Sequence, residues 1–292
     1  MSRPRTFTVA APDGVLLRVE EYAAQSPAAD GPLESAPTVV LAHGWTLTRR
    51  SWLPVAERLV GQGVRVIAYD QRGHGQSSAL RDQPTVRQLG DDLYAVLNIV
   101  APQGKVVLGG HSMGGMTIMA YAGRHPVDFG DRVAGVVLVA TSAGELMRSL
   151  PPVEAAFMRI AARMPRIAAG RAITVSAQRK LLFGDVADPE HVRLTRDQVA
   201  ATSLPTLGRF FSALGRHDEA EALAQLADTP TVVLAGERDK LTPASHAERI
   251  GELVPSARVE VLPGRGHMLM YEATDDVVAA FESVLAAQPE RH

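Results

Sequence analysis

A serine between two glycines constrains the fold of this chain more than any other feature, because of the segments on either side of it. The run Gly-His-Ser-Met-Gly at 110–114 follows an apolar segment at 105–109 and precedes a stretch of helical character at 116–124. A strand, a sharp turn and a helix are therefore predicted in direct succession. A serine at such a turn adopts a strained backbone, and small neighbours let strand and helix approach closely. The hydroxyl of Ser112 is then exposed as a candidate nucleophile.

A candidate general base lies near the C-terminal end of the sequence. The run Val-Glu-Val-Leu at 259–262 is typical of a short strand, and Pro-Gly-Arg-Gly at 263–266 ends that strand. His267 therefore falls on a loop, ahead of a helix expected at 273–285. An imidazole on such a loop is suited to accept the proton of a serine hydroxyl.

A candidate acid follows another predicted strand. Residues 231–235 are rich in β-branched side chains, and the turn at 236–243 leads from them into a helix. Asp239 lies in this turn, past the carboxyl end of the strand. We expect it to orient the histidine, and Glu237 is the nearest alternative acid.

Donors for a negatively charged oxygen are expected where a further strand ends. His43, Gly44 and Trp45 follow the predicted strand at 37–42. The backbone N–H of Trp45 and that of Met113 are expected to form an oxyanion hole, which binds the negative oxygen of a tetrahedral intermediate.

In these motifs the chain resembles the α/β-hydrolase superfamily, from about residue 9 to residue 285. The resemblance rests on the Gly-His-Ser-Met-Gly-Gly run, the His-Gly-Trp run, the turn at 236–243, the segment Tyr-Asp-Gln-Arg-Gly-His-Gly-Gln-Ser at 69–77, and the chain order nucleophile, acid, histidine. It implies an α/β-hydrolase fold, but fold membership does not name a substrate. We expect the 70–77 segment to be structural rather than to contact substrate.

The order of strands and helices predicts the same architecture, an α/β fold with a mostly parallel central sheet and helices on both faces. A hairpin at 6–10 and 15–22 turns through Asp13-Gly14. Strands are expected at 37–42, 64–69, 105–109, 133–139, 231–235 and 258–262, and helices near 52–61, 84–100 and 113–124. We expect residues 1–140 and 217–292 to form the two parts of the core, with a helical cap, residues 141–216, inserted between them.

The predicted cap has its own composition. Apolar residues at helical spacing predict a buried stripe, and arginines take the other side: Phe157, Ile160, Ala161 and Met164 against Arg159, Arg163 and Arg166. The segment holds 11 Lys and Arg against 6 Asp and Glu, a net charge of +5, which leaves −7 for the rest of a chain with a net charge of −2. We favour a solvated cap surface; the alternative is steering of anionic substrates or contact with a lipid surface.

Composition excludes several functional classes. With 292 residues, 46% of them hydrophobic, the chain can bury one large core, and its charge balance gives no reason to expect a nucleic-acid partner. It has no cysteine, so disulfides and thiolate metal sites are excluded, and we expect neither a metal nor a cofactor. The first residues lack a signal-peptide core and no apolar run is long enough to span a membrane, so we expect a cytoplasmic protein. Oligomeric state is not indicated.

The candidate residues together predict acyl transfer through a serine. His267 takes the proton of Ser112, Asp239 fixes the imidazole, and attack on a carbonyl gives an acyl-enzyme that the same histidine hydrolyses with water. The core alone is expected to build the nucleophile turn and the oxyanion hole, and the cap to supply remote binding. The pocket is expected to be apolar. Its expected residues come from the loop after the strand at 37–42, the helix after Ser112, the cap and the segment after His267: Gly44, Leu47, Met116, Leu146, Met147, Phe157, Met158, Met268 and Leu269.

We therefore expect a serine hydrolase of carboxylic esters with a medium, mostly apolar acyl or alcohol part, similar to esterases and monoacylglycerol lipases. A serine nucleophile argues against haloalkane dehalogenases and epoxide hydrolases, which use aspartate at this position. A carbon–carbon bond hydrolase, a cofactor-free perhydrolase or haloperoxidase-like enzyme, and an acyltransferase remain alternatives on the same residues. A non-catalytic small-molecule receptor is less favoured, because the triad is intact.

Overall fold

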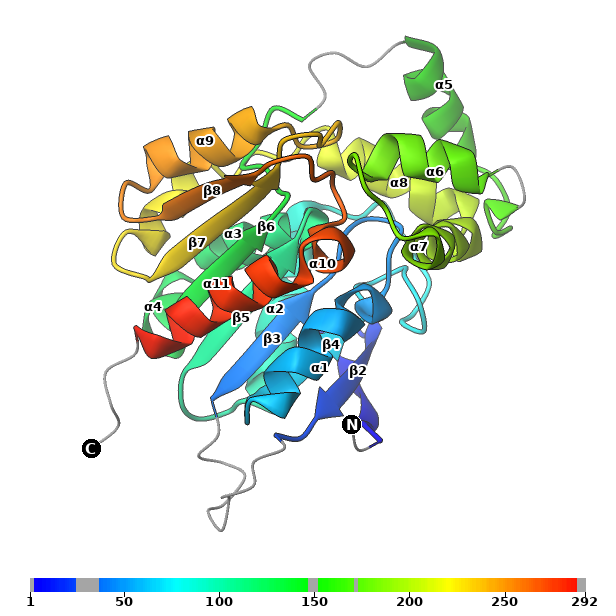
Figure 1. The fold of residues 1–292 in the computed structure, drawn as a ribbon. Coiled ribbons are helices and arrows are strands. Elements are labelled where there is room, and N and C mark those ends of the chain that lie inside the picture. The colour runs from blue at the N-terminus through cyan, green and yellow to red at the C-terminus, as the bar shows by residue number, and fades with distance from the viewer. Residues whose placement is uncertain (1–2, 25–36, 147–151, 171–172, 288–292) are drawn as a thin grey trace.

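The computed structural model describes residues 3–24, 37–146, 152–170 and 173–287, and side chains of 152–155 are not described. Within these residues eight strands form one sheet in the order β1-β2-β4-β3-β5-β6-β7-β8 (Figure 1). The strands are β1 (Arg5–Ala10), β2 (Leu16–Tyr22), β3 (Thr38–Ala42), β4 (Arg65–Tyr69), β5 (Val106–His111), β6 (Val133–Val139), β7 (Thr231–Gly236) and β8 (Arg258–Leu262). The predicted fold class is confirmed.

The direction of the strands gathers the candidate residues at one edge of the sheet. β1 pairs with β2 and β2 with β4 in antiparallel fashion, whereas all pairs from β4 to β8 are parallel. In register, Ala42 of β3 lies beside Gly110 of β5, and Gly236 of β7 beside Leu262 of β8. The carboxyl ends of the parallel strands therefore meet at one edge, where open α/β sheets place their ligands.

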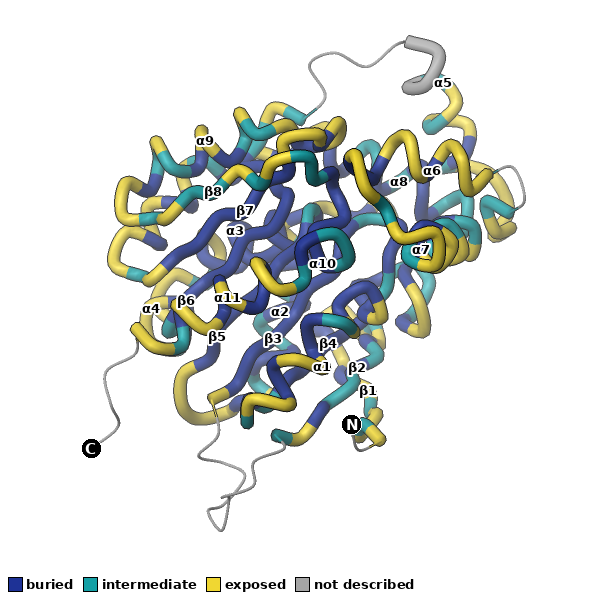
Figure 2. Tube along the Cα trace, viewed as in Figure 1, coloured by how far each residue is buried: buried dark blue, intermediate teal, exposed yellow. Residues whose placement is uncertain are grey.

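Helices cover both faces of the sheet. Alternate residues of β3 point to opposite sides, Val40 into one buried cluster and Leu41 into another. One face is covered by α2 (Val86–Val100), α3 (Met113–Arg124), α4 (Pro126–Arg132) and α9 (Ala244–Leu253), and the other by α1 (Leu53–Gly61), α10 (Leu269–Glu272) and α11 (Thr274–Ala286). Figure 2 shows the strands buried between these layers. The short helices α4 and α10 were not expected from the sequence.

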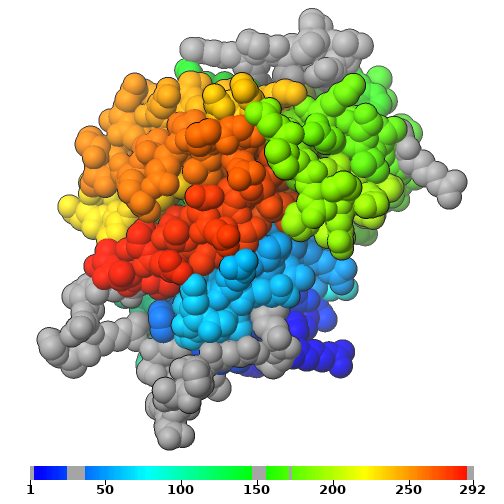
Figure 3. Space-filling model, in the orientation of Figure 1, coloured from blue at the N-terminus to red at the C-terminus, as the bar shows by residue number. Residues whose placement is uncertain are grey.

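Among the described residues between β6 and β7 the regular elements are helices, with two isolated β-bridges, Gly144 with Asp218 and Ala168 with Ser203. The helices are α5 (Pro152–Ala161), α6 (Val175–Leu182), α7 (Pro189–Ala201), α8 (Leu204–Leu214) and the 3-10 helix η4 (Glu221–Leu226). We refer to residues 141–216 as the cap. In the space-filling view its green surface meets both the orange-red C-terminal segment and the blue N-terminal part (Figure 3). No helix in the described part of the chain is long and apolar enough to cross a membrane.

The predicted apolar stripe of the cap is not buried, so that expectation is wrong. Phe157, Ile160 and Met164 are 55%, 61% and 41% exposed, and only Ala161 of the stripe is buried. The cause is a close backbone approach between α5 and α8. A Cβ added to Gly208 would lie 2.3 Å from the carbonyl oxygen of Met158. The small-residue contact brings α5 against α8 and leaves its larger apolar side chains outside.

Candidate active site

The backbone at Ser112 explains the glycines around it. Ser112 joins β5 to α3 with φ 52° and ψ −118°, a left-handed conformation that is costly for a residue with a side chain. A Cβ on Gly114 would lie 2.0 Å from the carbonyl oxygen of Ala42, and one on Gly110 would lie 2.5 Å from Gly114. Strand and helix therefore meet at a distance that only glycine permits.

Asp239 and His267 are in direct contact. The Nδ1 atom of His267 lies 2.7 Å from Oδ2 of Asp239. The hydroxyl of Thr242 also donates to this Oδ2, and the amides of Leu241 and Thr242 donate to Oδ1. Burial by itself raises the pKa of Asp239, but the nearby His267 and these hydrogen bonds outweigh it and hold the pKa below its usual value. The carboxylate is therefore ionised, and it binds Nδ1 as a hydrogen-bond acceptor.

Glu237, the alternative acid, lies elsewhere. Its side chain is exposed, and its Oε2 accepts a hydrogen bond from the amide of Gly264 at 2.9 Å. The structure therefore brings Asp239, not Glu237, to the imidazole.

A second histidine joins the serine turn to the loop of His267. Nε2 of His111 lies 2.9 Å from the carbonyl oxygen of His267, and the two ring centroids are 4.7 Å apart. A carbonyl oxygen only accepts, so Nε2 of His111 carries the proton. Burial, together with the neighbouring His267, lowers the pKa of His111 well below its usual value and keeps it neutral. Because His111 precedes Ser112, this bond sets the nucleophile turn beside the candidate base.

Two further buried histidines hold the loop after β3, which we call the oxyanion loop (residues 43–48). Nδ1 of His43 lies 2.7 Å from the carbonyl oxygen of Gly44, and its Nε2 accepts the amide of Gln71. His43 therefore donates through Nδ1, and the Gly44 carbonyl points toward it. The N–H of Trp45 belongs to the same trans peptide and points the opposite way. Burial lowers the pKa of His43 to about 4, which keeps the ring neutral.

His74 fixes the next residue of the oxyanion loop. Thr46 has φ 63°, and its amide donates to Nε2 of His74 at 3.2 Å. Nδ1 of His74 in turn lies 3.0 Å from the carbonyl oxygen of Arg72. Burial lowers the pKa of His74 to about 3. The 70–77 segment therefore supports the oxyanion loop through the contact of His74 with Thr46. No local pattern in the sequence indicates this contact.

The amides of Trp45 and Met113 remain available. Neither donates a hydrogen bond to another described residue. Met113 begins α3, whose first N–H groups have no partner within the helix. Gly44 lies against the nucleophile turn, since a Cβ on it would be 3.3 Å from Cβ of Ser112. The two expected donors therefore flank the serine without competing acceptors.

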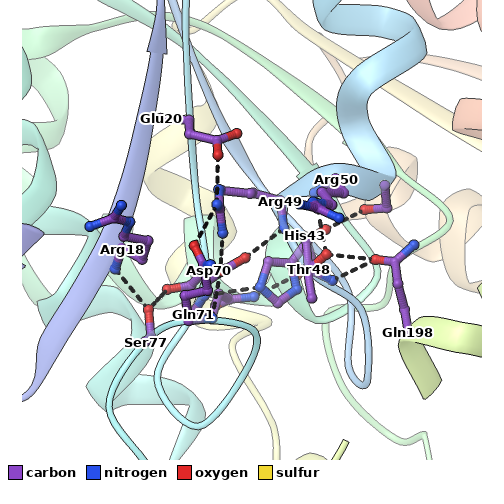
Figure 4. Close-up of polar contacts among 12 residues, drawn as sticks. Arg18, Glu20, His43, Thr48, Arg49, Arg50, Asp70, Gln71, Ser77 and Gln198 are labelled. Carbon is purple, nitrogen blue, oxygen red and sulfur yellow. Dashed lines mark hydrogen bonds and ion pairs between the residues drawn. The ribbon is translucent and has the colours of Figure 1, made fainter. Parts of the chain in front are cut away.

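The far end of the oxyanion loop is tied to the cap. The amide and hydroxyl of Thr48 both donate to Oε1 of Gln198 in α7, at 3.0 and 2.8 Å. Arg49 binds Asp70 and Glu20, as Figure 4 shows. Here an open cavity of about 990 Å³ is lined by Thr48, Arg49 and Gln198, and neither Ser112 nor His267 lines it. Polar side chains of this lining bind one another, as Thr48 binds Gln198 and Arg49 binds Asp70. We therefore place the candidate site around Ser112 and not in this cavity.

The expected pocket residues divide into two groups. Met116 packs in a buried cluster with Met113, Phe210 and Leu214, and Trp45 and Leu146 pack against it. Phe210 belongs to α8 of the cap, and its neighbour Phe211 lies 6.2 Å from the Trp45 ring. Neither Phe210 nor Phe211 is among the pocket residues expected from the sequence.

The other expected residues lie away from this cluster. Leu47, Met268 and Leu269 are buried in the core cluster under α1 and α11, where they have almost no exposed surface. Phe157 is on the outer side of α5, and Met147 lies outside the described residues. The part of the chain that the structure describes holds no group of three or more His, Asp or Glu side chains arranged to bind a metal.

Comparison with known proteins identifies the family of the fold. The family model described as the alpha/beta hydrolase fold matches residues 37–274. The chain is 29% identical over 259 residues to a pimeloyl-acyl-carrier-protein methyl ester esterase of Xanthomonas oryzae pv. oryzae, covering 87% of this chain and 96% of that one. It is 27% identical over 256 residues to a non-heme haloperoxidase of Rhodococcus erythropolis, covering 82% and 89%. A thermophilic esterase from Thermogutta terrifontis superposes with a TM-score of 0.78 at 25% identity, over 98% of each chain. The chain belongs to the α/β hydrolase fold family.

Proposed function

We propose that this protein is a serine hydrolase that cleaves carboxylic esters, with Ser112 as nucleophile, His267 as general base and Asp239 as its orienting acid. The observation that carries the proposal is the 2.7 Å contact between His267 and Asp239, on a loop that His111 fastens to the serine turn. The relatives named as esterases support the same class of reaction.

The geometry leads to a two-step mechanism. Nε2 of His267 accepts the proton of Ser112 as the serine oxygen attacks the ester carbonyl, and the ionised Asp239 stabilises the imidazolium. The amides of Trp45 and Met113 stabilise the oxyanion. The carbon–oxygen bond then breaks, and the leaving alcohol takes the proton from His267. Water, deprotonated by the same histidine, attacks the acyl-enzyme and releases the carboxylic acid and free Ser112.

The proposed substrates have a medium, mostly apolar acyl or alcohol part. The side chains gathered around the nucleophile turn are apolar, with Met116 and Phe210 at their centre and Trp45 and Leu146 at the edge. Phe210 comes from α8, so we propose that the cap shapes the acyl-binding wall between the two parts of the core. Remote contacts of this kind raise the rate for substrates long enough to make them.

A perhydrolase activity is the second candidate, favoured by the relative named as a non-heme haloperoxidase. It needs no change in the machinery, because hydrogen peroxide replaces water in attacking the acyl-enzyme and the product is a peracid. The ratio of peracid to acid formed from one ester at a fixed peroxide concentration decides between the two activities.

The exposed apolar side chains of α5 and the turn after it support a peripheral contact with lipid surfaces. Phe157, Ile160, Met164 and Ile167 are all more than 40% exposed, and Arg159, Arg163 and Arg166 beside them form no ion pair with a described residue. Such a surface fits an anionic interface. Cosedimentation with phosphatidylglycerol vesicles but not with phosphatidylcholine vesicles is expected; absence from both pellets would leave α5 a solvated face.

Labelling and turnover test the main proposal together. A fluorophosphonate probe should label the wild-type protein at Ser112 and fail to label Ser112→Ala. A panel of p-nitrophenyl esters from acetate to dodecanoate should then be hydrolysed with a maximum at intermediate length. A protein that is unlabelled and inactive on the whole panel is not a serine hydrolase.

A further inference from the structure

Glu272, the last residue of α10, accepts hydrogen bonds from three backbone amides. Its carboxylate lies 3.1 and 3.2 Å from the amide of Gly266, 3.1 Å from that of Met268 and 2.7 Å from that of Gly184. Gly266 and Met268 are the two residues on either side of His267. Gly184 belongs to the cap, between α6 and α7. One side chain therefore holds both neighbours of the candidate base and a segment of the cap 88 positions away.

The cap segment at this point runs along the histidine loop, residues 263–268. The amide of His267 donates to the carbonyl oxygen of Leu182 at 2.8 Å, and the amide of Asp185 donates to that of Gly264 at 2.8 Å. The approach leaves no room for side chains, because a Cβ on Gly184 would lie 2.1 Å from the Gly264 oxygen. The two segments thus meet backbone to backbone, and Glu272 joins them.

From these contacts we infer that Glu272 is a positioning residue for the proposed hydrolysis, which clamps the loop of His267 to the cap and so fixes the imidazole relative to Ser112. The inference rests on the proposed function for its effect on rate, but the clamp itself is a contact that is measurable without catalysis. Glu272 does not touch substrate; it acts through the backbone of the residue that does.

The chemistry of the contact favours this role over a passive one. Burial raises the pKa of Glu272, although the three amides and the nearby Arg265 act to lower it. Amides that lose a carboxylate acceptor in a partly buried site are left unsatisfied, so the loop must shift to find water. A misplacement of about 1 Å at a reacting group costs up to about 100-fold in rate.

The residue before Glu272 makes the same connection by a different contact. The ring of Tyr271 stacks on His191 of α7 with centroids 4.6 Å apart, and Gln198 of α7 lies 3.5 Å from its hydroxyl. The short helix α10 therefore carries two adjacent side chains that both reach the cap. Glu272 differs from Tyr271 in that it also reaches the two amides that flank His267.

Replacing Glu272 with glutamine removes the charge and sets an NH₂ group against the amide donors, at nearly unchanged size. We expect Glu272→Gln to lower kcat for p-nitrophenyl acetate by about 10- to 100-fold, with KM changed less than about threefold. Glu272→Asp keeps the carboxylate and should lose less than the glutamine variant. The matched control is Asp276→Asn, which neutralises an exposed carboxylate four residues later in α11.

Hydrogen exchange measures the clamp directly. Peptides covering 182–186 and 264–268 should exchange faster in Glu272→Gln than in wild type or Asp276→Asn, at a temperature well below unfolding. Unchanged exchange in both peptides overturns the inference, and so does faster exchange with unchanged kcat, since that describes a purely structural contact. If the wild-type protein is neither labelled by the probe nor active, the proposed function has failed. Equal exchange in wild type and Glu272→Gln is a separate result, and it would overturn the clamp.

Discussion

The backbone amide of His267 donates to the carbonyl oxygen of Leu182, 2.8 Å away, so the candidate base is held by a residue of the cap. The oxyanion loop is held in the same way, because the hydroxyl of Thr202 in the cap donates to the carbonyl oxygen of Thr46. Both loops that carry proposed catalytic groups therefore depend on the segment between β6 and β7. The expectation that the core alone builds the oxyanion hole did not include the contact of Thr202 with the oxyanion loop.

The proposed triad is expected to act as a single unit. Ser112→Ala and His267→Ala should each lower kcat by about 10⁴- to 10⁶-fold, and the double variant should be scarcely worse than either single one. Asp239→Asn should cost about 10²- to 10⁴-fold, because the amide no longer holds the required tautomer. Steady-state kinetics on one soluble ester measures all four. Glu237→Gln is the matched control, and a larger loss there than in Asp239→Asn would reassign the acid.

The space beside the nucleophile gives a second prediction. Gly44→Ala would place a Cβ 2.7 Å from Nδ1 of His111 and 3.3 Å from Cβ of Ser112, so the oxyanion loop must move away from the serine. We expect kcat to fall by about 10²-fold, the order of one lost oxyanion donor. Gly61→Ala in α1 is the control, since a Cβ there meets nothing within 4 Å. Equal activity of the two variants would show that the loop tolerates the displacement.

Two phenylalanines of the cap give a matched pair for the acyl pocket. Phe211 lies beside Trp45 on the oxyanion loop, whereas Phe157 is exposed on α5. Phe211→Ala should lower kcat/KM for octanoyl esters about 10-fold more than for acetyl esters, because a lost apolar contact of about 1.5 kcal/mol is made only by the longer chain. Phe157→Ala should leave the ratio unchanged. A ratio that shifts in neither variant would place the acyl chain elsewhere.

The buried histidines predict that the fold weakens in acid. Burial lowers the pKa of His43 to about 4, against about 6.5 in an unfolded chain. Its contribution to stability is therefore full above about pH 6.5, and it is lost as the pH falls toward 4, because only the unfolded state binds the proton. The slope from this residue is about 1.4 kcal/mol per pH unit. Urea unfolding from pH 7 to pH 4 measures it.

His43→Asn keeps a donor near the Nδ1 position and removes the titration. The free energy of unfolding of this variant should depend less steeply on pH than that of wild type, by about one proton. Parallel curves for the two proteins would show that His43 does not remain neutral in the fold.

Local signals made much of the fold and the nucleophile predictable. β-branched runs, the Asp-Gly turn and the glycines around Ser112 each act over a few residues, and the strands they indicate lie within one or two positions of the observed ones. The antiparallel pairing of β2 with β4 and the strand order depend on contacts between distant segments, which a single sequence does not display.

The supports of the candidate site were not predictable for the same reason. His74 reaches Thr46 across 28 positions and Glu272 reaches Gly184 across 88. The prediction of a buried stripe on α5 was wrong because helical spacing indicates which residues share a face, but not which face a neighbouring helix covers. The face of α5 that is covered is the one that contacts Gly208, a small residue on α8.

The backbone contact between the cap and the histidine loop also limits how such caps can be exchanged. A chimera that takes a foreign segment across positions 182–185 would have to reproduce the carbonyl of Leu182 and the side-chain-free approach of Gly184. A graft confined to α8, residues 204–214, brings in new pocket walls and leaves Leu182 and Gly184 in place, together with Gln198 and Thr202, which hold the oxyanion loop. Evolution of new specificity in this chain is therefore easiest in α8, and most constrained in residues 182–185.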